Sequence, residues 1–441
     1  TFPIMASELR ALGNAAVQMG LLVFVLQHVV LSCRTRPPRS HLPLSMAHSI
    51  LYVLRLLPYL AVCWILGRKG DDYGRQDRLW PEILRNIIAY GFRILDKRSS
   101  QFVLGVMRDV PKYMFGLRRY CKALSCHGVP CTFFSLDEAH NPQDVNLVLY
   151  FHGGAYCIGN AEMYLPQFYK LCLEMRKHRP DVPFGILSVE YSLAPEYKFP
   201  VALNQALEVY KWALFHCSRS IVLAGDSAGG GLSVAVLLRA QEESLRPADG
   251  LILISPWVDP SGESLPSAHL ESTKYADFLR KQELAEMSRS YVYGSCGREE
   301  EGEEKNCEQT KGPETYEGEV GENKYSRSDD HQNSSSSTSS SNGINSSSSS
   351  SSSSSRFSVS HPLVSVMRAN TQQLSRLPKT LVFSGGREIL SPQIKMFVKR
   401  LKPDMCTHVE DTRAMHIWAS GWPLLAKEGA EGAAKMRNFI S

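Results

Sequence analysis

The sequence lacks the patterns that mark several common classes of protein. It has no stripe of basic residues with interleaved aromatic side chains, so nucleic-acid binding is not expected. Its eleven cysteines are an odd number scattered over 441 residues, whereas disulfide frameworks organise short secreted chains. Cys121, Cys126 and Cys131, with His127 among them, are spaced too widely for zinc-binding pairs, and no second pair follows. We therefore expect no metal site and interpret these cysteines as ordinary thiols.

Charge is moderate and unevenly spread along the chain. The formal net charge is +5, yet residues 296–356 hold twelve acidic and six basic side chains, a local net charge of −6. This segment is first Glu- and Gly-rich and then almost pure Ser, with few apolar groups to offset the entropy of ordering it. We expect a disordered insertion there. Asn333 and Asn345 each begin an N-x-S sequon, which is usable only on the lumenal or extracellular side of a membrane.

Two apolar runs near the start of the chain predict membrane association. Residues 15–32 are close to the minimum length for crossing a bilayer, although Gln and His side chains weaken the run. Residues 50–67 contain Arg55 and Pro58, which are costly inside a spanning helix. We expect the first run to be a signal anchor. The alternatives are a hairpin of both runs in one leaflet, or two helices that cover a functional site. No clear A-x-A site follows, which disfavours a cleaved signal peptide.

The rest of the chain alternates between strand-like and helix-like segments. Short apolar, β-branched runs, typical of strands buried on both faces, occupy 145–151, 184–191, 220–226, 250–255, 379–385 and, last, 405–409. Helical patterns fill 163–178, 202–216 and 229–243. This order predicts an α/β fold with a mostly parallel central sheet and helices on both faces. The mixed, aromatic-rich stretch from about 80 to 130 is interpreted as helices of a cap.

Residues Gly225-Asp226-Ser227-Ala228-Gly229 fit the pattern G-x-S-x-G. They lie directly after a predicted strand and directly before a predicted helix, which is the context of a nucleophile elbow. Small neighbours permit the strained turn that lifts the Ser hydroxyl clear of the sheet, and the dipole of the following helix points at the reaction centre. Ser227 is therefore the predicted nucleophile.

A second glycine-rich turn, His152-Gly153-Gly154-Ala155, follows the strand that ends at residue 151. Acyl transfer builds negative charge on a carbonyl oxygen, and backbone N–H groups must already point at that oxygen. The predicted oxyanion hole consists of the N–H groups of Gly153, Gly154 and Ala228. His152 is expected to brace this turn.

A serine nucleophile needs a base, and the base needs an orienting acid. In this arrangement the chain order is Ser, acid, His. His416 follows the last predicted strand and is the favoured base, with His408 as the rival. Glu388 follows the strand 379–385 and is the favoured acid, with Asp411 and Glu410 as fallbacks.

Three blocks together resemble the hormone-sensitive-lipase-like branch of the α/β-hydrolases: HGGA (152–155), YSLAPEYKFPVAL (191–203) and GDSAGGGL (225–232). The resemblance runs from about 145 to 441, without the insertion. It implies an α/β-hydrolase fold with a helical cap, and Tyr191 and Pro195 as structural support. Where that branch has Asp in a D-P-L motif, this chain has Glu388, Ile389 and Leu390.

The apolar N-terminal runs, the Glu in the acid position and the serine tract also resemble the fungal steryl acetyl hydrolases. This resemblance implies an endoplasmic-reticulum membrane enzyme with a lumenal catalytic domain, which deacetylates sterol acetates through an acetyl-Ser227 intermediate without a cofactor. A broad-specificity carboxylesterase or arylacetamide-deacetylase-like enzyme is the first alternative. The second is a non-catalytic ligand-binding protein like the plant gibberellin receptors, which lose the catalytic His, whereas His416 is present here.

The expected organisation has five parts. They are a membrane-associating segment (1–67), cap helices and a lead-in (68–140), the first part of the hydrolase core (141–295), the disordered insertion (296–356) and the C-terminal part of the core (357–441).

Overall fold

The computed structural model describes residues 108–109, 112–113, 116–217, 219–273, 277–294, 358–420 and 426–441. Among these residues eight strands form one sheet in the order β1-β2-β4-β3-β5-β6-β7-β8. The pairs β1–β2 and β2–β4 are antiparallel, and every other pair is parallel. The strands are β1 (Cys121–Cys126), β2 (Val129–Phe134), β3 (Asn146–Phe151), β4 (Phe184–Val189), β5 (Ile221–Asp226), β6 (Gly250–Ile254), β7 (Thr380–Gly385) and β8 (Cys406–Asp411).

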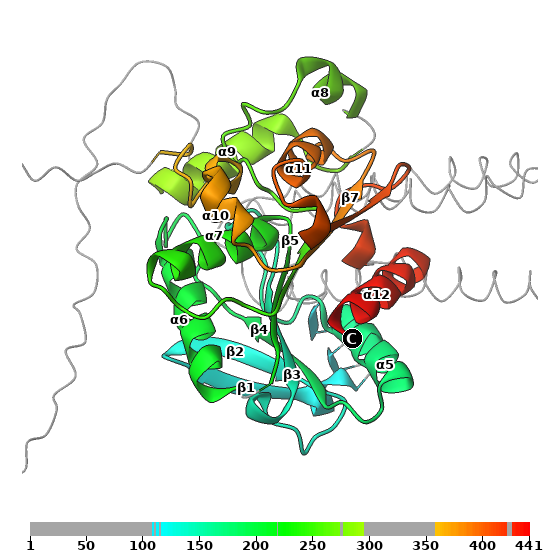
Figure 1. Ribbon diagram of the computed structural model, residues 1–441. Helices are drawn as coiled ribbons and strands as arrows, with labels where there is room; N and C mark the ends of the chain where they lie inside the picture. The colour runs from blue at the N-terminus through cyan, green and yellow to red at the C-terminus, as the bar shows by residue number, and fades with distance from the viewer. Residues whose placement is uncertain are drawn as a thin grey trace, which may run out of the picture. The chain divides into compact units, whose positions relative to one another are not determined.

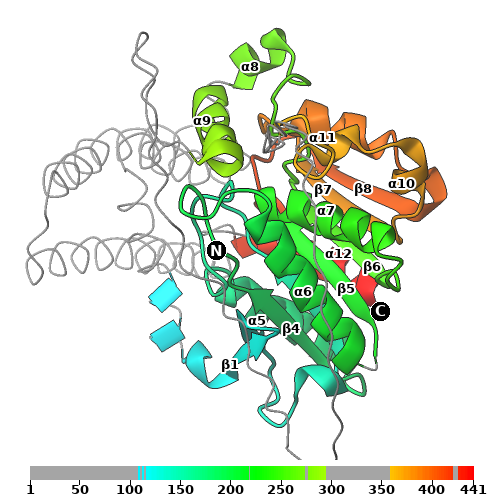
Figure 2. The same ribbon diagram turned by 90° about the vertical axis from the view of Figure 1, so that its left-hand side faces the viewer.

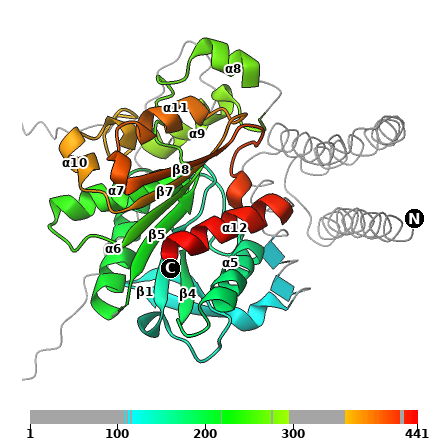
Figure 3. The ribbon, with the colours of Figure 1, turned by 45° about the vertical axis from the view of Figure 1, so that its right-hand side comes forward.

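Helices cover both faces of this sheet (Figure 1). On one face α6 and α7 lie side by side (Figure 2), and on the other α5 and α12 do (Figure 3). The helices of the described residues are α5 (Leu165–His178), α6 (Val201–His216), α7 (Ala228–Glu242), α8 (Ser267–Thr273), α9 (Lys281–Tyr293), α10 (Thr371–Ser375), α11 (Ser391–Val398) and α12 (Ala426–Ile440). The predicted mostly parallel sheet with helices on both faces is confirmed.

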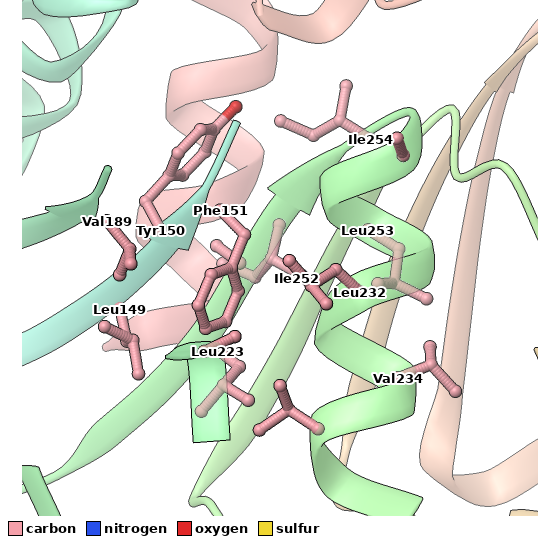
Figure 4. Close-up of a cluster of buried hydrophobic side chains, with 14 of the residues drawn as sticks. Leu149, Tyr150, Phe151, Val189, Leu223, Leu232, Val234, Ile252, Leu253 and Ile254 are labelled. Atoms are coloured by element: carbon pink, nitrogen blue, oxygen red, sulfur yellow. The ribbon is translucent and has the colours of Figure 1, made fainter. Parts of the chain in front are cut away.

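The core lies where the central strands meet the helices. Every residue of β4, β5, β6 and β7 is buried, which explains why these segments read as continuous apolar runs rather than alternating ones. In Figure 4, side chains of β3, β5 and β6 gather with Leu232 and Val234 of α7. Because α7 is buried along almost its whole length, the helix that follows Ser227 is fixed firmly against the sheet.

The prediction of cap helices from about 80 to 130 is wrong for residues 121–130, which belong to two strands and their turn. Residues 121–134 form an antiparallel hairpin at the edge of the sheet, with Cys126 paired to Val129 across the two-residue turn His127-Gly128. Both turn residues have positive φ, 49° and 82°, which matches the right-handed twist of the flanking strands. The X-Gly dipeptide between two short apolar runs was the signal for this hairpin.

The other N-terminal predictions and the insertion lie outside the described residues. The two apolar runs, 15–32 and 50–67, belong to this part of the chain, and so does the whole of 296–356. Among the residues that are described, none of the helices has both the length and the apolar character to span a bilayer.

The close contact between α7 and β3 generates a first prediction. A Cβ on Gly229 would lie 2.0 Å from the carbonyl oxygen of Phe151, so Gly229→Ala must push the helix away from the sheet. We expect the free energy of unfolding to fall by about 1–3 kcal/mol, measured by thermal or denaturant unfolding. The matched control is Gly250→Ala, where the added Cβ meets side chains rather than backbone: the Phe439 ring at 3.0 Å, which can move, and Val222 Cγ2 at 3.4 Å, an ordinary contact. Equal losses in the two variants would contradict this account.

Candidate active site

Ser227 occupies the sharp turn between β5 and α7. Its φ of 49° and ψ of −119° are strained for a non-glycine residue, as a nucleophile elbow requires. The turn is possible because its neighbours are small: a Cβ on Gly225 would lie 2.3 Å from the carbonyl oxygen of Gly229. The Ser227 N–H donates to the carbonyl of Ile254 at the end of β6 (2.9 Å), which fixes the turn to the neighbouring strand.

The residue before the nucleophile, Asp226, is a fully buried carboxylate. It accepts hydrogen bonds from Tyr150 Oη (2.8 Å), Tyr164 Oη (2.5 Å) and the Gly153 N–H (2.9 Å). Burial raises the pKa of Asp226, and these three donors oppose that rise. Asp226 therefore ties the nucleophile turn to the turn after β3. The sequence pattern did not indicate a role for Asp226, because the variable positions of G-x-S-x-G carry no signal of their own.

The prediction that Gly153 contributes to the oxyanion hole is wrong, because its N–H already donates to Asp226. Within the described part of the chain, no hydrogen bond is made by the N–H groups of Gly154, Ala155 or Ala228. Gly154 and Ala155 have positive φ, 114° and 51°, so the backbone bends sharply there. The free donors in this turn are thus one residue further along the chain than predicted.

Glu388 and His416 are brought together by the structure. The Nδ1 of His416 lies 2.7 Å from Oε2 of Glu388, and Oε1 of Glu388 accepts the N–H of Gly385 at 2.8 Å. Both side chains are almost fully buried: His416 is 3% exposed and Glu388 is 0% exposed. Burial lowers the pKa of His416, but the hydrogen bond and charge of Glu388 outweigh it, so the pKa is raised. With Nδ1 bound to the acid, Nε2 is left to exchange protons with a substrate or nucleophile.

The end of β6 joins the histidine loop to the nucleophile turn. The N–H of Ile417 donates to Ser255 Oγ (3.0 Å), while the N–H of Ser227 donates to the carbonyl of the preceding residue, Ile254. Ser227 and the residue after His416 are therefore hydrogen-bonded to Ile254 and Ser255, two consecutive residues at the end of β6. Their nearness also appears in the electrostatics, because a charged His416 lowers the pKa of the adjacent Asp226.

The rival residues have other partners. His408 lies on β8 with its Nε2 2.7 Å from Ser384 Oγ, and Glu410 forms an ion pair with Lys395 at 2.7 Å. Asp411 accepts the N–H of Arg413 (2.9 Å). None of these contacts pairs a histidine with a carboxylate, as the contact between His416 and Glu388 does, so the geometry favours Glu388 and His416 as acid and base.

Aromatic side chains support the turn after β3. The ring of His152 stacks on Tyr191 at 4.3 Å between centroids, and Tyr191 Oη donates to the His152 carbonyl at 2.6 Å. Burial lowers the pKa of His152 to about 4, which keeps the ring neutral. Tyr156, in the same turn, stacks on Tyr291 of α9 with centroids 3.8 Å apart. These contacts fit the bracing roles expected for His152 and Tyr191.

The segment from α8 to α9 packs across the same edge of the sheet. The Phe278 ring lies 5.6 Å from the His416 ring, and Nε2 of His269 lies 3.0 Å from the carbonyl oxygen of Glu388. Nothing in the sequence pattern pointed to this segment. As for metal ions, the described residues contain no group of three or more His, Cys, Asp or Glu side chains arranged to hold one.

The buried acid–base pair generates a prediction about pH. Glu388→Gln keeps an oxygen beside Nδ1 but removes the charge that stabilises imidazolium, so the pKa of His416 should fall. Ester hydrolysis needs neutral His416, so the acid limb of kcat/KM should move to lower pH. The plateau should drop by about 10³–10⁴-fold. Glu410→Gln is the matched control, and an equal loss there would contradict the assignment of Glu388.

The matches to known proteins cover parts of this chain. A model of the alpha/beta hydrolase fold matches residues 148–304. Hormone-sensitive lipase of Homo sapiens is 35% identical over 121 residues, which are 26% of this chain and 11% of that protein. An acetyl-hydrolase of Streptomyces hygroscopicus is 30% identical over 158 residues, which are 35% of this chain and 50% of that protein. The chain thus spans only a small part of the lipase and half of the acetyl-hydrolase.

Solved structures extend the match over more of the chain. The crystal structure of the hormone-sensitive-lipase homologue EstE7, from a metagenome library, superposes with a TM-score of 0.55. The superposition covers 82% of this chain and 97% of the EstE7 chain. The two sequences are 20% identical, so this match supports the fold alone. The chain therefore has the α/β-hydrolase fold, and its sequence is similar over part of its length to hormone-sensitive lipase and to a bacterial acetyl-hydrolase.

Proposed function

We propose that the protein is a serine carboxylic-ester hydrolase that removes acetyl groups from sterol acetates or similar bulky lipophilic alcohols. The observation that carries the esterase proposal is the buried Glu388–His416 pair, held beside the strained Ser227 turn by the end of β6. Acyl transfer requires an acid that orients a base, and a base that activates the nucleophile.

In the proposed reaction, Ser227 Oγ attacks the acetyl carbonyl carbon while His416 Nε2 takes the hydroxyl proton. The N–H groups of Gly154, Ala155 and Ala228 stabilise the negative oxygen that forms. His416 then gives the proton to the departing alcohol, which leaves acetyl-Ser227. A water molecule attacks this ester with His416 again as base, and acetate leaves as Ser227 recovers its proton.

Two features support a lipophilic acetyl ester as the substrate. Aromatic side chains pack beside the proposed base and in the turn after β3: Phe278 packs on His416, and Tyr156 stacks on Tyr291. Such surroundings favour an apolar alcohol over a charged one. One sequence relative is named an acetyl-hydrolase, and the chain also resembles the steryl acetyl hydrolases in its N-terminal runs, its Glu388 and its serine tract.

The location of the enzyme belongs to the same proposal. A membrane anchor in residues 1–67 would place the enzyme beside the bilayer that dissolves its substrate. We propose the endoplasmic-reticulum membrane, with the catalytic domain on the lumenal side. No organic cofactor takes part in the proposed reaction.

The deciding experiment is hydrolysis of a short-chain ester series and of a sterol acetate by wild type, Ser227→Ala and the control Ser272→Ala, which alters an exposed serine of α8. We expect wild type and the control to hydrolyse both substrates, and Ser227→Ala to lose at least about 10⁴-fold in kcat. Turnover of short-chain esters alone would leave a general carboxylesterase. No Ser227-dependent hydrolysis of any ester would reject the enzyme and favour a ligand-binding protein on the hydrolase scaffold.

Lumenal placement makes a separate prediction. The sequons at Asn333 and Asn345 meet the glycosylation machinery only if they lie inside the endoplasmic reticulum. Treatment of the cell-expressed protein with an endoglycosidase should increase its gel mobility, and Asn333→Gln with Asn345→Gln should abolish that change. An unchanged mobility of the wild type would argue against the lumenal side.

A further inference from the structure

The residue after the proposed acid makes a contact that the usual motif of this branch could not make. Where the D-P-L pattern has proline, which carries no N–H, this chain has Ile389. The Ile389 N–H donates to Oδ2 of Asp277 at 2.8 Å. Oδ1 of Asp277 accepts the N–H of Phe278, also at 2.8 Å, and the Asp277 side chain is buried, at 3% exposed. The buried carboxylate of Asp277 therefore accepts a hydrogen bond from the backbone N–H of the residue directly after Glu388.

The segment that carries Asp277 contacts the acid and the base at two further points. His269 Nε2 lies 3.0 Å from the Glu388 carbonyl oxygen, and the Phe278 ring packs against His416. The N–H of Asp277 itself donates to the carbonyl of Thr273 (3.1 Å) at the end of α8. Hydrogen bonds thus hold both the backbone N–H and the carboxylate of Asp277.

Asp277 is also a second negative charge beside the Glu388–His416 pair. Its charge raises the pKa of His416, in the same direction as Glu388 does, and the more distant Asp226 adds to this effect. Burial raises the pKa of Asp277 to about 6; the charge of Glu388 adds to that rise, and His416 opposes it. The titratable groups that face one another here are Asp277, Glu388, His416, His269 and Asp226.

We infer that Asp277 is a positioning residue for the proposed hydrolysis, which orients Glu388 through the Ile389 N–H and supports the imidazolium form of His416 by its charge. This inference rests on the proposed function, and three variants separate it from a merely structural role.

The hydrogen bond from Ile389 and the negative charge of Asp277 can be removed one at a time. Asp277→Asn removes the charge but keeps an oxygen that can accept from Ile389. Ile389→Pro keeps the charge but removes the N–H, using the residue found in the D-P-L pattern. Asp277→Ala removes both. Asp259→Asn is the matched control, because Asp259 is an equally buried carboxylate after β6 whose hydrogen bonds go to Ser261, Ser264 and Ser365.

The readout is the rate at which a fluorophosphonate labels Ser227, measured from about pH 5 to pH 9, a range that brackets the titration of a base near neutrality. This probe reports activation of the serine whatever ester the enzyme prefers. For Asp277→Asn we expect the acid limb to move to lower pH. Ile389→Pro should lower the plateau by about 10- to 100-fold without moving that limb. The control should keep the wild-type midpoint.

The combined variant Asp277→Ala with Ile389→Pro should label little more slowly than Asp277→Ala alone, because both changes break one hydrogen bond. The inference is overturned if Asp277→Asn keeps the wild-type midpoint and the effects of Asp277→Ala and Ile389→Pro on the labelling rate are additive. Asp277 is then only a structural brace. If wild type does not react with the probe, the esterase proposal fails instead. The titration of the His416 Nδ1–H signal by proton NMR, which needs no reaction, then tests whether Asp277→Asn still shifts the midpoint.

Discussion

The carboxylate of Asp226 is the constraint around which the site is arranged. A fully buried negative charge is costly unless several donors surround it, and here the donors come from three different places in the chain. Tyr150 lies on β3, Tyr164 directly before α5, and Gly153 in the turn after β3. Because Asp226 is the residue before Ser227, satisfying this charge also sets the distance between the nucleophile turn and the N–H groups that follow Gly153.

The acid and base are held by a separate set of contacts on the other side of the nucleophile. Glu388 and His416 come from the loops after β7 and β8, which are tied together by the hydrogen bonds Gly386 N–H to Asp411 O (2.8 Å) and Arg387 N–H to Ala414 O (3.0 Å). A parallel sheet brings the carboxyl ends of all its strands to one edge, so residues far apart in sequence meet there. The end of β6, between β5 and β7, joins the two sets.

Much of this arrangement follows from the sequence, and the failures have identifiable causes. The buried parallel strands and helices α5 to α7 were predicted within a few residues, because apolar runs and their spacing carry that information. The hairpin 121–134 was missed because half-exposed edge strands have no continuous apolar run. The donor at Gly153 was misassigned because composition shows which turn is glycine-rich but not where each N–H points. Asp277 had no local signal at all, since its role depends on a contact with Ile389, more than a hundred residues away.

The packing of α8 and α9 has a consequence for the evolution and engineering of this enzyme. In many hydrolases the segments that cover the site are exchanged to obtain new substrates while the catalytic groups stay unchanged. Here the segment that carries Tyr291, which stacks on the turn after β3, also carries Asp277, which holds the backbone of the acid. Changing the segment that packs on the turn after β3 would therefore also change the support of Glu388 in this chain. A transplanted segment would have to bring its own carboxylate to accept the Ile389 N–H.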